Sequence, residues 1–446
     1  MGKSILTRGG GPKEPANPKS RGAPPETGFP RHADGLRCEG VRLAAIAAQV
    51  GTPAYVYSSA AVREQYGLLR GALGSMDVRL HYSVKANSSI AILGLLRELG
   101  AGLDIVSGGE LFRALKAGFS SADIVFSGVG KTEREMEEAL RAEVLLFNVE
   151  SEQELHVLDK VAEHLKMKAR VALRVNPEVL VDTPHPYTRT GEKGMKFGIP
   201  FDEALSVGKA AATLPNVRLL GLDMHVGSQI SQFAPYEVGL QRLLHLRREI
   251  ERETKVKLEY LDIGGGLAVT YDAERTVDIA NFGEVISALV SGSGMKIILE
   301  PGRFLVGNAG VLLTRVLYRK RSGGKEFIIT DAGMTDLLRP SHYNAFHRIE
   351  AVHPTGRTTV ADVVGPVCES GDFLALDRQM DDAQPGNLLA VRSTGAYGFV
   401  MASNYNSRPR PVEVLVDGDR FGVITERESY DDLVRNERLE PEWRYV

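Results

Sequence analysis

The sequence has little cysteine, a single tryptophan and no long apolar run. Only two of its 446 residues are cysteines, Cys38 and Cys368. Two cysteines build no disulfide framework, which fits a reducing compartment. No apolar stretch approaches the ~20 residues that a membrane-spanning helix needs, and the N-terminus lacks the apolar segment of a secretory signal. These absences predict a soluble, cytoplasmic protein without a membrane partner.

A clear excess of either charge is missing too. The chain carries 54 basic and 57 acidic residues, for a formal net charge of −3. Such a balance gives no electrostatic reason to expect nucleic acid or an anionic membrane as a partner. The length, in contrast, exceeds what one compact core usually serves, and it predicts two domains, one of which could be a large barrel.

The organisation changes three times along the chain. Residues 1–33 are rich in Gly, Pro, Lys and Arg and have no hydrophobic period, which predicts a disordered N-terminal tail. From residue 53 to 310, short β-branched runs alternate with helix-like segments such as 133–141, 152–165 and 236–252. This alternation predicts a TIM-like (β/α)8 barrel over 53–310. The eight expected strands are Val78–Val84, Leu103–Val106, Ile124–Ser127, Val144–Asn148, Val171–Val175, Leu219–His225, Tyr260–Ile263 and Ile297–Glu300.

After residue 310 the helical periods become rare, and strands separated by turns predominate. This pattern predicts a second, mostly β domain over 311–446, which the segment 34–52 is expected to join. The expected strands are Val311–Tyr318, Glu326–Thr330, Thr358–Val364, Asn387–Val391 and Pro411–Val416. The chain is therefore expected to be an α/β protein, a barrel with a C-terminal β domain.

Polar residues gather where the expected barrel strands end. Lys85 follows the first strand, His225 ends the sixth, Gly264–Gly266 follow the seventh, and Glu300 and Arg303 follow the eighth. Active sites of such barrels lie at the carboxyl ends of the strands. We therefore expect these side chains to meet on one face of the barrel.

The triple glycine and the lysine each have an ordinary explanation and a chemical one. Three glycines often form a simple turn, but after strand seven, with Arg303 after strand eight, they favour a phosphate-binding loop. A lysine is most often a surface residue, but a partly desolvated amine forms an imine with an aldehyde cofactor. Together they favour pyridoxal phosphate, whose pyridine nitrogen Glu300 would face. His225 could stack on the ring, although an isolated histidine is more often structural.

Six motifs, in this order, resemble the alanine-racemase-like (fold type III) pyridoxal-phosphate decarboxylases, and diaminopimelate decarboxylases in particular. The resemblance covers nearly the whole chain after residue 34. The motifs are Tyr82–Asn87, His225–Gln229, Asp262–Gly266, Glu300–Arg303, Cys368–Ser370 and Gly395–Gly398.

The resemblance implies a role for each of these residues. Lys85 would be the Schiff-base lysine, and Cys368 the proton donor, which in this family reaches the site from the second subunit. An obligate homodimer with two shared active sites is therefore expected. Cys368 could instead be a small buried hydrophobic residue. The implied cofactor-binding residues are Lys85, His225, Ser228, Gly264, Gly265, Gly266, Glu300, Gly302, Arg303 and Tyr397.

The substrate is predicted from charge. Arg339–Tyr343 resembles the stretch that holds the substrate's distal carboxylate in diaminopimelate decarboxylases, and a guanidinium pairs with a carboxylate bidentately. Glu369 would receive the distal ammonium, and Arg303 and Tyr397 would also contact the substrate. Residues 187–191 and 196–198 resemble a lid loop, before which Thr183–Pro186 departs from the family by an additional proline.

The predicted reaction is decarboxylation of meso-2,6-diaminopimelate to L-lysine, with Cys368 or Lys85 returning a proton. Decarboxylases of ornithine, arginine or lysine would share the cofactor site but should lack an arginine for a distal carboxylate. A racemase usually places an arginine, not a glutamate, at the pyridine nitrogen. A non-catalytic regulator tends to lose the cofactor lysine or the proton donor, and this chain keeps Lys85 and Cys368. No metal is expected.

Overall fold

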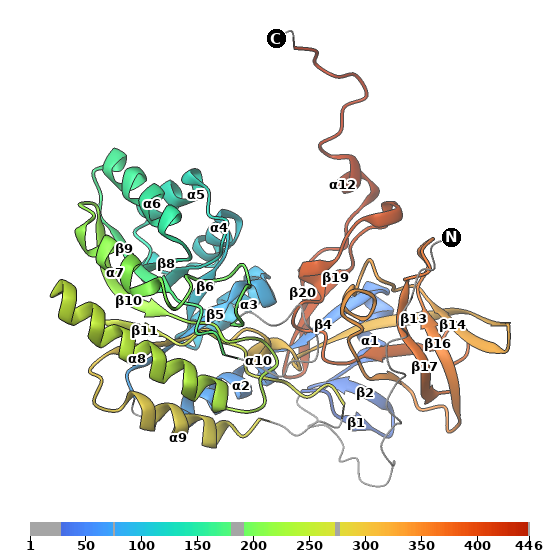
Figure 1. The fold of residues 1–446 in the computed structure, drawn as a ribbon. Helices are drawn as coiled ribbons and strands as arrows, with labels where there is room; N and C mark the ends of the chain where they lie inside the picture. Colours follow the sequence, from blue (N-terminus) through green and yellow to red (C-terminus); the bar gives the residue numbers. More distant parts are fainter. Residues whose placement is uncertain (1–27, 75, 180–190, 273–276, 445–446) are drawn as a thin grey trace, which may run out of the picture.

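The chain folds into a parallel barrel and a β-rich part that lie side by side (Figure 1). The fold is described from a computed structural model, which covers the chain except residues 1–27, 75, 180–190, 273–276 and 445–446. No helix among these described residues is long and apolar enough to cross a membrane.

Eight parallel strands close the barrel in sequence order, so that β12 pairs with β5. The runs are short and nearly all of their residues are buried, as expected where a barrel interior lies on one side and helices on the other. The eight predicted strands are all present within a few residues of their expected bounds. They are β5 (Val78–Ser83), β6 (Gly102–Ile105), β7 (Ile124–Phe126), β8 (Leu146–Val149), β9 (Ala169–Arg174), β10 (Val217–Asp223), β11 (Tyr260–Asp262) and β12 (Lys296–Leu299).

Five of the helices between the strands, α2, α4, α5, α6 and α9, begin at side-chain caps that the sequence supplies. Thr132 and Glu135 form a reciprocal capping box at the start of α5, and Ser107 and Ser151 cap α4 and α6. Such caps satisfy backbone N–H groups that have no partner within the helix. The helices of this part are α2 (Ser59–Ala72), α3 (Ile90–Glu98), α4 (Gly108–Lys116), α5 (Glu133–Ala142), α6 (Glu152–Leu165), α7 (Ala204–Thr213), α8 (Ala234–Thr254), α9 (Ile279–Val290) and α10 (Arg303–Val306).

The β-rich part is built on one nine-stranded sheet. Strand β13 is central to it, because its first part pairs with both β4 and β18 and its second part pairs with β14. Two short helices, α11 (Arg339–Tyr343) and α12 (Tyr430–Val434), also belong to the chain after residue 310. The strands of the sheet are β4 (Ala54–Ser58), β13 (Gly310–Ser322), β14 (Lys325–Thr330), β15 (Ile349–Ala351), β16 (Thr358–Val364), β17 (Phe373–Asp381), β18 (Leu388–Val391), β19 (Val412–Asp417) and β20 (Arg420–Thr425).

The segment before the barrel packs on this sheet rather than on the barrel. It contains β1 (Arg31–His32), β2 (Gly35–Cys38), β3 (Val41–Arg42) and α1 (Leu43–Val50). Apolar residues of the segment share one core cluster with residues of β4, β13 and β19. Cys38 lies in this cluster with its side chain fully buried.

Two predicted boundaries need correction. Residues 53–58 were expected in the barrel, but β4 pairs with β13 and β19, because its alternate residues complete the core of the sheet. Residues 28–33 were expected in a disordered tail, but β1 pairs with β2 and Phe29 is only 1% exposed. A lone Phe between Gly, Pro and Arg has no hydrophobic period, so the sequence pattern did not reveal its burial. Residues 1–27 of the predicted tail lie outside the described residues.

Candidate active site

Lys85 lies at the carboxyl end of β5, in the short 3-10 helix η1 (Val84–Ala86). Its Nζ donates a hydrogen bond to Oδ2 of Asp104 at 3.0 Å, and Ser83 Oγ donates to the same oxygen at 2.8 Å. Burial by itself would lower the pKa of Lys85, but the carboxylates of Asp104 and Glu300 outweigh it and raise that pKa. The amine is therefore held by charge at the mouth of the barrel, with 37% of its side chain still exposed.

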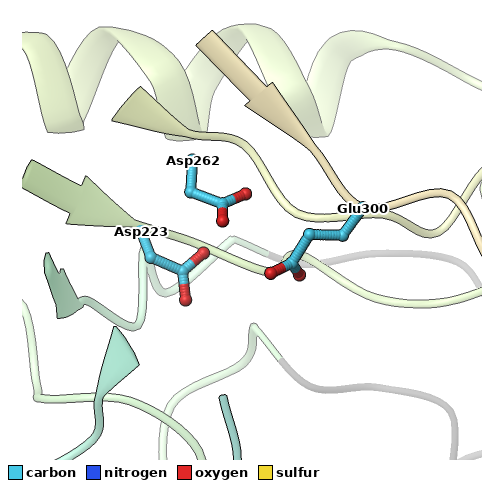
Figure 2. A group of neighbouring side chains, drawn as sticks. All are labelled: Asp223, Asp262 and Glu300. Carbon is cyan, nitrogen blue, oxygen red and sulfur yellow. The ribbon is translucent and has the colours of Figure 1, made fainter. Parts of the chain in front are cut away.

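Below the lysine, the barrel interior holds three more buried acids. Figure 2 shows Asp223, Asp262 and Glu300 pointing toward one another from the ends of β10, β11 and β12, with one carboxylate oxygen of each within 4.8 Å of the others. Burial raises the pKa of Asp262 to about 7, and burial together with Asp104 and Asp262 raises that of Glu300. Crowded carboxyl groups without water cannot all ionise. The cluster therefore retains protons near neutral pH.

The loop after β11 requires glycine at each of three consecutive positions. A Cβ on Gly264 would lie 2.4 Å from the carbonyl oxygen of Met224, and one on Gly266 would lie 2.2 Å from that of Gly227. At Gly265 the distance to the carbonyl oxygen of Glu300 would be 2.0 Å. These contacts are with backbone atoms, which do not rotate away. The triple glycine thus lets this loop pack directly against the ends of β10 and β12.

His225 is hydrogen-bonded to the glycine loop. Its Nδ1 accepts a hydrogen bond from the N–H of Gly265 at 3.1 Å. Burial, with Arg174 and Lys85 nearby, lowers the pKa of His225 well below its usual value. The ring is therefore neutral and fixed in one orientation.

Arg303 faces the same loop from the start of α10. Its Nη2 donates to Ser228 Oγ at 3.3 Å and its Nη1 to Tyr271 Oη at 2.6 Å, while its guanidinium lies 4.8 Å from the ring centre of Tyr397. Its Nε is buried without a partner among the described residues. A buried, incompletely satisfied guanidinium beside a glycine loop is suited to an anion. The donor set therefore fits a phosphate group.

The neighbouring Gly302 and Tyr397 hold the same end of the barrel together. A Cβ on Gly302 would lie 3.1 Å from that of Ser83 and 3.2 Å from that of Ala86. The N–H of Tyr397 donates to the carbonyl of Ala86 at 2.8 Å, next to the lysine. Tyr397 has a φ of 55°, an unusual conformation for a residue other than glycine.

Arg339, which was predicted to bind the substrate, contacts Tyr271, which is hydrogen-bonded to Arg303. Its guanidinium lies 4.9 Å from the centre of the Tyr271 ring, and its Nη1 donates to Nε2 of His347 at 2.9 Å. Arg339 begins α11 and is only 7% exposed. Tyr343, four residues later, is half-buried and is one of several tyrosines that help to raise the pKa of Arg303. Arg303 and Arg339 thus flank Tyr271.

Cys368 and Glu369 stand apart from this group. Both are exposed, in the loop between β16 and β17, where Asp372 accepts backbone hydrogen bonds from Met334 and Val367 at 2.6 Å each. No hydrogen bond or ion pair within the described part of the chain joins either residue to Lys85 or Arg339. Of the predicted lid loop, residues 183–190 lie outside the described residues.

Several residues of the site escaped the sequence analysis. Asp104 is the penultimate residue of β6, and Lys85 follows the neighbouring β5, so the position of Asp104 near the end of a predicted strand was an available signal. Tyr271 and His347 lie in loops far apart in the sequence, and only tertiary contact reveals them.

Comparison with known proteins gives consistent matches. Residues 59–307 match the pyridoxal-binding domain of the pyridoxal-dependent decarboxylases. Diaminopimelate decarboxylase from Aquifex aeolicus is 47% identical over 90% of this chain and 94% of its own. The enzyme from Pseudomonas aeruginosa is 48% identical over 91% and 98%. The structure of diaminopimelate decarboxylase from Helicobacter pylori, complexed with L-lysine, has 38% identity and a TM-score of 0.85 over 88% of this chain and 98% of that one.

These matches extend over both parts of the fold and agree with a lysine, a glycine loop and two arginines at one barrel end. The chain belongs to the diaminopimelate decarboxylases, the fold type III, pyridoxal-phosphate-dependent enzymes that convert diaminopimelate to lysine and carbon dioxide.

Proposed function

We propose that this reaction takes place at the barrel mouth, with Lys85 as the Schiff-base residue. The observation that carries the proposal is the convergence of the Lys85 amine, the glycine loop and the Arg303 guanidinium on one end of the barrel. Bound pyridoxal phosphate supplies an electron sink that makes loss of carbon dioxide from an amino acid possible. In this arrangement Ser228, Gly266, Gly302 and Arg303 would surround the phosphate, while the N–H groups of Gly264 and Gly265 donate to Asp262 and His225 and shape the loop.

Glu300 and His225 would serve the ring of the cofactor. Glu300 is buried at the end of β12, and its Oε1 accepts from Ser127 Oγ at 3.4 Å, which orients the carboxyl group. A proton held between Glu300 and the pyridine nitrogen keeps the ring positively charged. The neutral His225, fixed by the N–H of Gly265, offers a flat face for stacking.

Substrate recognition would rest on Arg339, with Arg303, Tyr343 and Tyr397 around it. Diaminopimelate keeps one carboxylate at the end that does not react, and a buried guanidinium pairs with it bidentately. The Helicobacter pylori relative was solved in complex with L-lysine, which retains that carboxylate. This supports Arg339 as the residue that separates diaminopimelate from amino acids without a distal carboxylate.

The chain would act as a homodimer in which Cys368 and Glu369 reach the site of the partner subunit. The exposure of both residues on a loop braced by Asp372 supports this arrangement. Mixing inactive Lys85→Ala and Cys368→Ala subunits tests it. Random reassociation should restore up to about a quarter of wild-type activity, because each mixed dimer regains one complete site. No recovery after verified subunit exchange would contradict shared sites.

A cytoplasmic location would suit this chemistry. Both cysteines are free thiols, and Cys368 is exposed, so the proposed proton donor needs reducing surroundings to stay unoxidised. No charge excess supports a nucleic-acid partner.

The decisive experiment compares substrates on the holoenzyme. Purified protein with pyridoxal phosphate receives meso-diaminopimelate, ornithine, lysine or arginine separately, and carbon dioxide release is recorded beside the visible spectrum. Release from diaminopimelate alone, lost in Lys85→Ala together with the visible band of the bound cofactor, is the expected result. A visible band with a different reactive amino acid would refute the role of Arg339. The absence of any band would refute the assignment of Lys85.

A further inference from the structure

His347 is a buried histidine that the reaction itself does not require. Its side chain is 0% exposed and lies between Arg339, Tyr271 and the backbone of Arg392. Nδ1 lies 2.8 Å from the carbonyl oxygen of Arg392, and Nε2 lies 2.9 Å from Nη1 of Arg339. A carbonyl cannot donate and a guanidinium cannot accept. The contacts therefore leave one assignment, in which Nδ1 carries the proton and Nε2 is a neutral acceptor for Arg339.

The Arg339 guanidinium is thereby held on two sides. One N–H group is taken by His347, and one face lies over Tyr271, whose ring also meets His347 edge-on at 5.3 Å and 86°. Within the described part of the chain no carboxylate lies within ion-pair distance of Arg339, although many other arginines have one. The guanidinium is thus oriented, yet its charge is not neutralised.

The anchor behind His347 is itself rigid. Arg392, whose carbonyl accepts from Nδ1, forms an ion pair with Glu350, and Glu350 also binds Arg31 at 2.5 Å. The Arg392 guanidinium lies 5.5 Å from the ring centre of Phe29. Strand-end backbone and an ion-pair network therefore fix the imidazole from the side opposite Arg339.

We propose that His347 is a positioning residue that sets the selectivity for a distal carboxylate, by holding the Arg339 guanidinium through a neutral acceptor. The inference rests on the proposed function, because it assumes that Arg339 receives that carboxylate. A neutral partner suits the task better than Asp or Glu would, since a carboxylate would occupy the bidentate edge and cancel the charge. With its orientation fixed, the remaining donors of the guanidinium meet a planar carboxylate without losing further side-chain freedom.

Two amide substitutions separate the two hydrogen bonds of His347. In His347→Gln the side-chain oxygen reaches the place of Nε2, so the acceptor for Arg339 is kept. In His347→Asn the amide ends near the place of Nδ1, so the contact with the Arg392 carbonyl is kept but the acceptor for Arg339 is lost. His347→Leu fills the buried volume with no acceptor at all, and it serves as the second acceptor-free variant in case His347→Asn does not fold.

The test is an equilibrium titration of each holoenzyme with L-lysine and with cadaverine, in which binding is measured by calorimetry. L-Lysine retains the carboxylate assigned to Arg339, and cadaverine is the same chain without it. Loss of a hydrogen bond that orients a charged group should weaken L-lysine binding by about 10- to 100-fold. Cadaverine binding should stay within about twofold in every variant, and His347→Gln should bind L-lysine nearly as wild type does.

Steady-state kinetics give a second measurement. The KM for diaminopimelate should rise in His347→Asn and His347→Leu with a smaller change in kcat, and it should be largely restored in His347→Gln. Equal weakening of both ligands in all three variants would overturn the inference, since it would indicate a merely structural residue. Unchanged L-lysine binding in His347→Asn or His347→Leu would overturn it too.

Arg339→Leu separates failure of the inference from failure of its premise. If Arg339→Leu abolishes the preference for L-lysine over cadaverine while the acceptor-free variants do not, only the role of His347 is wrong. If Arg339→Leu leaves that preference intact, Arg339 does not receive the carboxylate, and the proposed substrate role and the inference both fall.

Discussion

Replacing Gly265 with alanine should damage cofactor binding far more than the stability of the chain. The backbone of Gly265 does not lie in the left-handed region, so an alanine there faces a problem of space alone. The added Cβ would stand 2.0 Å from the carbonyl oxygen of Glu300 and 3.0 Å from its carbonyl carbon. Because both atoms belong to the backbone, the loop after β11 and the end of β12 must move apart.

The size of the effect follows from that distance. Real Cβ contacts essentially never fall below 3.0 Å, so the two segments must separate by about 1 Å. Overpacking of this kind costs about 1–3 kcal/mol of unfolding free energy, which a domain of this size can tolerate. A displacement of about 1 Å at a reacting centre reduces catalysis by about 100-fold. Glu300 and the glycine loop lie on the two sides of the displacement, so both of the proposed cofactor contacts should weaken together.

Equilibrium dialysis with pyridoxal phosphate, kcat measured at saturating cofactor, and urea unfolding of the apoprotein check this prediction. The matched control is Gly94→Ala in α3, where an added Cβ meets no atom within 4 Å. The control should keep full activity and gain about 1 kcal/mol of stability, because alanine favours a helix interior. Wild-type cofactor affinity and kcat in Gly265→Ala would refute the packing argument.

Three further predictions concern charge and burial. Asp104→Asn removes a carboxylate that raises the pKa of Lys85. Because pyridoxal phosphate reacts with the neutral amine, the rate at which the apoenzyme binds the cofactor should reach its maximum at lower pH in this variant. An unchanged pH profile of that rate would contradict the prediction. Burial raises the pKa of Asp262 from 3.8 to about 7, so the folded apoprotein keeps a proton that the unfolded chain releases. Its stability should therefore fall as pH rises from about 4 to about 7, and urea unfolding of Asp262→Asn should show a flatter profile over that window. Phe29→Ala should lower the unfolding free energy by about 3–5 kcal/mol. The control Phe112→Ala, at a side chain that is 65% exposed, should change it by less than about 0.5 kcal/mol. Equal effects of the two substitutions in urea unfolding would contradict the packing of Phe29.

The parts of the fold that were predictable are those encoded locally. Eight buried runs separated by amphipathic segments predict the barrel strands, because each run must bury two faces. Strand ends then predict that Lys85, the glycine loop and Arg303 share one face, since parallel strands present their carboxyl ends together. β4 could not be assigned in this way, because an apolar run before a helix reads the same in a barrel and in a sheet.

Contacts between residues that are far apart in the sequence could not be predicted from a sequence pattern either. Asp104 could be placed on a strand end, but its bond to Lys85 depends on how η1 turns the lysine inward. Tyr271 and His347 are 76 positions apart in the numbering and meet only because the segment after α11 lies against the loop after β11. No local period or motif marks such pairs.

The site separates its charges into two zones. The barrel interior holds the buried carboxyl groups of Asp104, Asp223, Asp262 and Glu300, and the cations that face them are the lysine amine and Arg174, which pairs with Asp223 and Glu150. On the other side, two buried arginines flank Tyr271, with neutral groups rather than acids as their partners.

This separation gives a ligand only one favourable orientation. Under the proposed function, anionic groups such as a phosphate and a distal carboxylate would lie beside Arg303 and Arg339, whereas protonated nitrogens would lie beside the acids. The distribution also explains why tyrosine and histidine hold the arginines. An aspartate in place of His347 would extend the acidic zone across the site and remove the positive zone that the substrate carboxylate needs.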